Sequence, residues 1–192
     1  METLLSLCVG VGLSAACGFR VFVPLLLMSI AANSGHLALA TGFEWIGSFP
    51  ALLAFAVASV VEIAGFFVPW IDHLLDVAAT PAAIVAGIVV TASIISDVSP
   101  FLRWSLAVIA GGGAAGIVQA STVTLRGASL VSTGGFGNPL ISAAELVGSV
   151  LASVMAIVVP VLAIVTMIAA VLLMMVTTLR FREKSTRIAA EH

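Results

Sequence analysis

The chain has 192 residues, of which 61% are hydrophobic and only 8% are charged. Soluble domains carry about a quarter charged residues, so this composition excludes an ordinary soluble domain and predicts an all-α, polytopic integral membrane protein in a lipid bilayer. The net charge of −2 conceals a basic C-terminal end, where four of the seven basic residues lie. No basic surface for nucleic acid is expected. We predict one transmembrane domain over 1–180 and a short basic tail over 181–192.

The hydrophobic runs predict about six membrane-spanning helices, because about twenty apolar residues cross the hydrocarbon core. The segments are about 3–32, 50–70, 80–96, 103–131, 139–159 and 161–179. The first lacks the positively charged start of a signal peptide, so we expect it to remain as a helix. No polar loop separates the last two, and one helix over 139–179 would be about 60 Å long. A turn or sharp break is therefore expected near Pro160.

The first and fourth segments are each too long for one untilted span, and each carries an interruption that contains one arginine. The interruptions are GFRVFVP, Gly18–Pro24, and QASTVTLRG, Gln119–Gly127. Each is followed by a glycine-bearing connection and then by a helix that starts with proline. The halves 1–98 and 99–180 are therefore predicted to be copies of a three-helix unit, and an odd number of spans makes the copies inverted.

The basic tail sets the predicted orientation. The positive-inside rule places this tail in the cytoplasm, and six spans then place the N-terminus there as well. The same count puts the loop that holds Asp72, His73 and Asp76 on the cytoplasmic side.

Glu62 is the sharpest single signal for a functional site. It lies about 18 Å into a helix that starts near Pro50, which predicts a position close to the bilayer midplane. A bare carboxylate costs roughly 2.5–3.5 kcal/mol at that depth, so we expect it to face the interior, paired or protonated. It is either a structural carboxylate that holds helices together or a proton-coupling, ligand-binding group. Glu145, in the fifth segment, is a second candidate of the same kind.

Arg20 and Arg126 are the natural counter-charges for these two acids. Approaching from the two interruptions, they would form either an anion-attracting centre or two ion pairs with Glu62 and Glu145. Each arginine also has the length to reach an interface instead.

Asp72 and Asp76 are one helical turn apart, with His73 beside them. Two such carboxylates are the hard oxygen ligands that Mg²⁺ takes together with a phosphate. They are equally consistent with solvated groups at a membrane surface.

Two further patterns carry little chemistry. GGGAAG, Gly111–Gly116, matches a dinucleotide-binding motif only formally, because it lies inside an apolar helix; it predicts close helix packing. Cys8 and Cys17 fall on opposite faces of a helix and suggest no zinc site. No cofactor is expected.

The stretches GLSAACGFRVFVPLLL and VPWIDHLLDVAATP resemble the small bacterial membrane proteins grouped as domain of unknown function 4126. Phe66 and Phe67 depart from the family pattern, in which an acid–lysine pair often precedes the proline. The resemblance implies a compact polytopic helical protein of the bacterial cytoplasmic membrane, without an established activity. Its most specific residues here are Glu62, Pro69, Asp72, His73, Asp76, Thr80 and Pro81.

The leading functional hypothesis is binding or transport of a small anionic or amphipathic solute at a central site. The alternatives are a metal-dependent enzyme acting on lipid phosphates, through Asp72, Asp76 and His73, and a membrane scaffold. Whether the chain forms a homo-oligomer is left open.

Overall fold

The computed structural model describes residues 2–65, 69–166 and 168–169. Within these ranges it describes the side chains of all residues except Glu2 and 69–77. Over these residues the chain is all helical, without a strand, and the predicted fold class is confirmed at this level. The α-helices are α1 (Glu2–Cys17), α2 (Phe22–Asn33), α3 (Phe49–Gly65), α4 (Pro69–Ile94), α5 (Pro100–Leu106), α6 (Gly113–Thr133) and α7 (Asn138–Val158). Two short elements are a 3-10 helix, η1 (Glu44–Gly47), and a π-helix, η2 (Ala107–Gly112).

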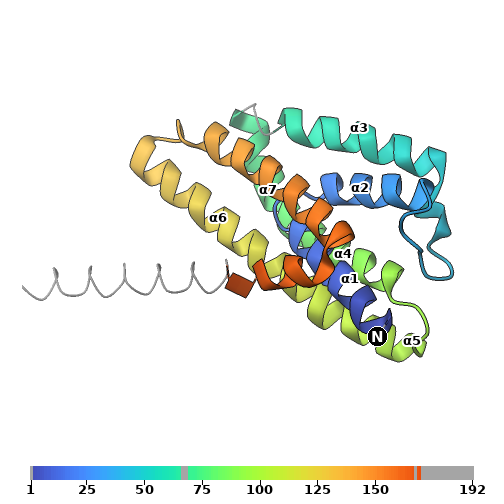
Figure 1. Ribbon diagram of the computed structural model, residues 1–192. Helices are drawn as coiled ribbons and strands as arrows, with labels where there is room; N and C mark the ends of the chain where they lie inside the picture. The colour runs from blue at the N-terminus through green and yellow to red at the C-terminus, as the bar shows by residue number, and fades with distance from the viewer. Residues whose placement is uncertain (1, 66–68, 167, 170–192) are drawn as a thin grey trace, which may run out of the picture.

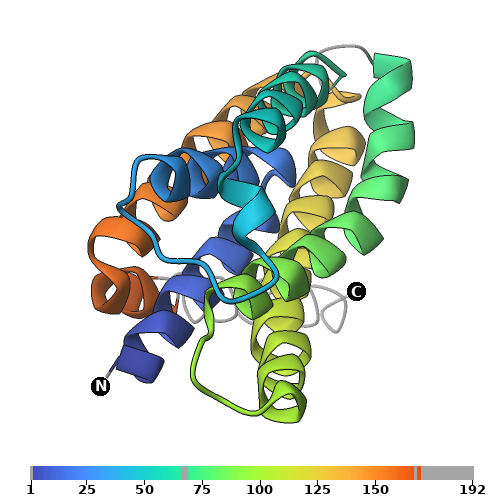
Figure 2. The ribbon, with the colours of Figure 1, turned by 90° about the vertical axis from the view of Figure 1, so that its right-hand side faces the viewer.

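Helix α1 is the centre of the bundle and packs against α4, α6 and α7 (Figures 1 and 2). Its side chains Leu13, Ala16 and Cys17 are fully buried. Helix α3 packs on α2 and touches α4 only sparsely. The pair α2–α3 therefore forms one side of the molecule, with an opening between α3 and α4.

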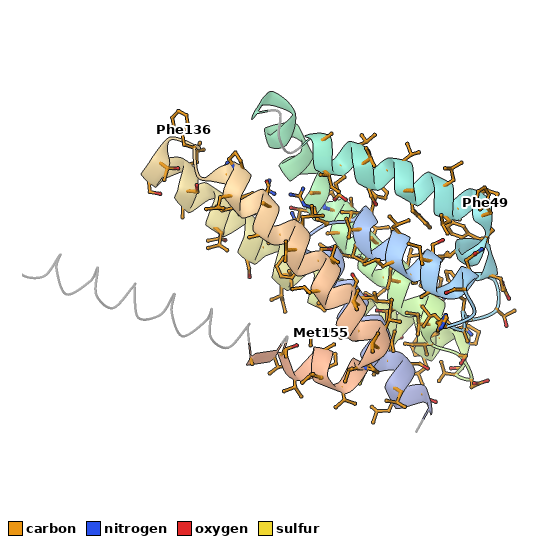
Figure 3. All side chains as sticks on the ribbon, turned by 45° about the horizontal axis from the view of Figure 1, so that its top comes forward. Phe49, Phe136 and Met155 are labelled. Atoms are coloured by element: carbon orange, nitrogen blue, oxygen red, sulfur yellow. The ribbon has the colours of Figure 1, made fainter. Side chains whose placement is uncertain are left out.

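The surface carries many large apolar side chains, and polar or charged side chains are buried beside the apolar core of the described residues. Phe49 and Phe136 are 69% and 92% exposed and point away from the bundle (Figure 3). Helical stretches Pro100–Thr133 and Asn138–Val158 are long and apolar enough to cross a bilayer, and several shorter helices are also apolar. These features are compatible with membrane association.

Two predicted breaks are present. Helix α1 ends at Cys17 and α2 begins at Phe22, which confirms the interruption in the first segment. Val159 has φ −138° and ψ 69°, so the chain leaves the helical conformation just before Pro160, as expected.

Beyond 169 the predicted sixth segment and the basic tail lie outside the described residues. The third segment begins earlier than predicted, at Pro69, so the region assigned to a loop is helical.

The predicted interruption at Gln119–Gly127 is wrong, because α6 runs through it without a break. The polar side chains that suggested an unwound segment bond within the helix instead. Ser121 and Thr124 donate to the carbonyls four residues back, at 2.9 and 2.7 Å. Helices accommodate serine and threonine in this way. The fourth segment does depart from α-helical geometry at one place, the π-helical turn η2, which lies before the polar run.

Glycines bring η2 into close contact with α4, which agrees with the packing role predicted for GGGAAG. A Cβ added at Gly111 would lie 2.6 Å from the carbonyl oxygen of Gly87 and closer still to the Thr91 hydroxyl. A Cβ at Gly113 would meet nothing within 4 Å. The backbones of η2 and α4 therefore approach closely only where side chains are absent.

We expect Gly111→Ala to lower the free energy of unfolding by about 1–3 kcal/mol, because the new methyl group meets backbone and cannot be accommodated by a rotamer change. Gly113→Ala is the matched control and should be neutral or stabilising by less than about 1 kcal/mol. Thermal unfolding of the two purified variants measures the difference. Equal stabilities would show that η2 and α4 do not touch as described.

Candidate functional site

The break between α1 and α2 leaves backbone N–H groups at the start of α2 without partners inside their own helix. The buried carboxylate of Glu62, on α3, satisfies two of them. Val21 N–H donates to Oε1 at 2.7 Å and Phe22 N–H donates to Oε2 at 3.0 Å. A negative charge at this end of a helix is also favoured by the helix dipole. Glu62 thus caps α2 from a neighbouring helix.

The predicted depth of Glu62 close to the bilayer midplane stays a prediction. Helix α3 as described ends at Gly65. Glu62 therefore lies in the last turn of α3. Both hydrogen bonds that Glu62 accepts within the described chain come from backbone N–H groups, whereas the sequence predicts an arginine as one possible partner.

Glu145, on α7, is shared by both arginines. Arg126, on α6, donates from Nε to Oε1 at 3.0 Å and from Nη2 to Oε2. Arg20, in the α1–α2 break, places Nη2 at 3.5 Å from Oε2 of the same carboxylate. Ser142, one turn before Glu145, accepts a hydrogen bond from each guanidinium group. Arg20 donates to its carbonyl oxygen at 3.0 Å, and Arg126 donates to its Oγ at 3.2 Å. This cluster ties α6 and α7 to the break in the first segment.

The two acids Glu62 and Glu145 and the two arginines Arg20 and Arg126 are all at least 93% buried and lie around one place in the bundle. Glu62, Arg126 and Glu145 line a small cavity with polar walls, which we call the polar cavity. Its volume is about 10 Å³, close to the space that a single water molecule needs. It is lined by Phe19, Val21, Glu62, Ala79, Gln119, Thr122, Arg126 and Glu145.

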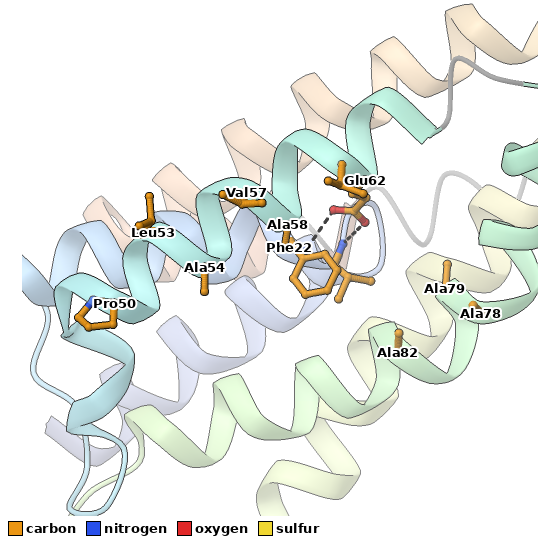
Figure 4. A pocket seen from close by; sticks show the side chains of 12 residues that line it. Phe22, Pro50, Leu53, Ala54, Val57, Ala58, Glu62, Ala78, Ala79 and Ala82 are labelled. Carbon is orange, nitrogen blue, oxygen red and sulfur yellow. Dashed lines mark hydrogen bonds between the residues drawn. The ribbon is translucent and has the colours of Figure 1, made fainter.

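A second and larger space, the α3–α4 groove, lies where these two helices diverge (Figure 4). Its volume is about 750 Å³. Its described lining is apolar except for Glu62. The residues are Val21, Phe22, Pro50, Leu53, Ala54, Val57, Ala58, Val61, Glu62, Ala78, Ala79 and Ala82.

Glu62 belongs to the wall of both spaces, together with Val21 and Ala79. The apolar groove therefore ends at the carboxylate, and the polar cavity begins there. An apolar space that reaches one ionisable group is suited to a molecule with an apolar part and a polar part.

Small side chains create the groove. Ala54 and Ala58 are one turn apart on α3, and Ala78 and Ala82 are one turn apart on α4 (Figure 4). Sequence reasoning missed this feature, because small residues at this spacing are more typical of closely packed helices. It also missed Ser142, whose only signal is its position one turn before Glu145.

Asp72, His73 and Asp76 lie in the first turns of α4, but their side chains lie outside the described part of the structure. The metal site predicted for them stays a prediction. Among the residues that the structure does describe, no three His, Cys, Asp or Glu side chains gather in a way that could hold a metal ion.

The fold and the site define an all-helical protein with an apolar surface and a buried cluster of acids and arginines. The chain belongs to the family described as Domain of unknown function (DUF4126), which matches residues 7–180 and confirms the family resemblance seen in the sequence. Comparison with the curated proteins and with the solved structures gave no match.

Replacing Arg126 by alanine should lower the free energy of unfolding by about 3–5 kcal/mol, because a buried carboxylate loses the guanidinium that bonds both of its oxygens. Arg103→Ala is the control: this α5 arginine makes no ion pair within the described chain, and its loss should cost less than about 1 kcal/mol. Thermal or denaturant unfolding in one detergent measures both. Similar losses in the two variants would contradict the role given to the Arg126–Glu145 pair.

Proposed function

We propose that this chain is an integral membrane protein that binds a small amphipathic solute in the α3–α4 groove and allows its passage along the bundle. The apolar surface and the long apolar helices support the membrane setting. The proposal includes the six spans and the cytoplasmic termini that the sequence predicts, and the two inverted three-helix units.

The observation that carries the proposal is the junction of the two spaces at Glu62. An amphipathic molecule would lie with its apolar part between α3 and α4 and its polar part at the carboxylate. Binding sites for small molecules are commonly apolar clefts in which a few polar groups fix orientation. The volume of the groove lies within the range of about 300–1,000 Å³ that such sites have.

The amphipathic solute is favoured over a purely anionic one by the positions of the arginines. Arg20 and Arg126 both contact Glu145 and Ser142. Neither is among the described lining residues of the groove. A solute in the groove thus meets a carboxylate before it meets a guanidinium.

We expect a photoreactive dodecyl amphiphile to label the residues of the groove, and Ala58→Phe to abolish that labelling, because the phenyl ring occupies the space between α3 and α4. Ala64→Phe is the matched control: Ala64 is exposed on α3 and does not line the groove. Peptide mapping by mass spectrometry, with the full chain in lipid nanodiscs, gives the readout. Labelling that is equal in the wild type and in Ala58→Phe would overturn the proposed site.

A further inference from the structure

We propose that the α3–α4 groove selects a single-chain amphiphile with a cationic ammonium head. The head would lie at Glu62 and the chain would run along α3 toward Pro50. This inference rests on the proposed function and names the class of molecule that the groove takes.

Charge complementarity at the inner end of the groove favours a cation. Among the lining residues that the structure describes, Glu62 is the one ionisable group. Its oxygens accept one backbone N–H each, at 2.7 and 3.0 Å. Since a carboxylate oxygen offers two lone-pair sites, each retains one acceptor position. An ammonium head supplies both the N–H donors and the opposite charge, and such charge-assisted bonds are strong in apolar surroundings.

An aromatic ring lies beside the carboxylate and also favours a cation. Phe22 lines the same end of the groove, and its ring lies next to Glu62 in Figure 4. The face of an aromatic ring attracts a cation, and ammonium heads are commonly recognised this way. An anionic head would meet the carboxylate and the negative face of the ring together. The same two groups that attract a cation therefore disfavour an anion.

The apolar part of the groove extends along α3 away from Glu62. Pro50 and Glu62 are about 18 Å apart along the helix axis. Between them the α3 wall is formed by leucine, valine and alanine, and the part of the α4 wall that the structure describes is formed by alanine. An apolar groove of this length fits an extended alkyl chain that leads away from one polar head.

The test uses three photoreactive dodecyl probes that differ only in the head: ammonium, sulfate and hydroxyl. Each is applied to the full chain in phosphatidylcholine nanodiscs, and labelling of the groove is normalised to labelling of α7. We expect the ammonium probe to label the groove about tenfold more than the sulfate probe, as a single charge-assisted bond would produce. Glu62→Gln should reduce this ratio to about twofold or less, and Glu44→Gln, an exposed acid outside the groove, should leave it unchanged.

A second variant keeps the test decisive if Glu62→Gln fails to fold. Phe22→Leu keeps an apolar side chain but removes the ring, and it should lower the ammonium preference about threefold. Phe49→Leu, at an exposed phenylalanine outside the groove, is its control. A sulfate or hydroxyl probe that labels as strongly as ammonium, with labelling still lost in Ala58→Phe, would overturn the cationic head alone. If no probe shows labelling that Ala58→Phe removes, the proposed function fails as well.

Discussion

A helix that begins inside an apolar bundle leaves backbone N–H groups without partners, and the rest of this structure depends on how Glu62 satisfies two of them at the start of α2. The carboxylate belongs to α3, so the two bonds fix α3 against the end of α2 rather than against α4. Helix α3 consequently packs on α2 and only sparsely on α4. The α3–α4 groove is the result of this arrangement, and its inner end is the carboxylate that caused it.

The Arg126–Glu145 ion pair stabilises the same break between α1 and α2, because Arg20 joins the break to this pair. Arg20 comes from the break itself and reaches Glu145 and Ser142, both on α7. Buried charges are costly unless they are paired and hydrogen-bonded, which explains why acids and arginines gather at one place. The break in the first segment is therefore the point where α2, α3, α6 and α7 are joined by polar contacts. A solute that reaches Glu62 through the groove would reach this junction too.

The sequence predicts which ionisable residues lie in this candidate site better than it predicts how they are arranged. Ionisable residues inside apolar segments are costly, so Glu62, Glu145, Arg20 and Arg126 stood out from their surroundings, and Gly18 with Pro24 marked the break. The polar run Gln119–Gly127 gave a wrong prediction of an interruption, because hydroxyl groups within it hydrogen-bond to backbone carbonyls of α6 itself. The backbone partners of Glu62 and the groove could not be predicted, because alanines one turn apart fit open and closed helix pairs alike. Those features depend on how far apart helices distant in sequence come to lie.

The most direct test of the central claim is amide hydrogen exchange at Val21 and Phe22 in the purified full chain. The account predicts that both amides are protected in the wild type, and that Glu62→Ala speeds their exchange at least about tenfold, as loss of about 1.4 kcal/mol of local stability would require. Amides in the middle of α7 should keep their wild-type rates in the variant. Unchanged exchange at Val21 and Phe22 would show that the Glu62 carboxylate does not hold the start of α2.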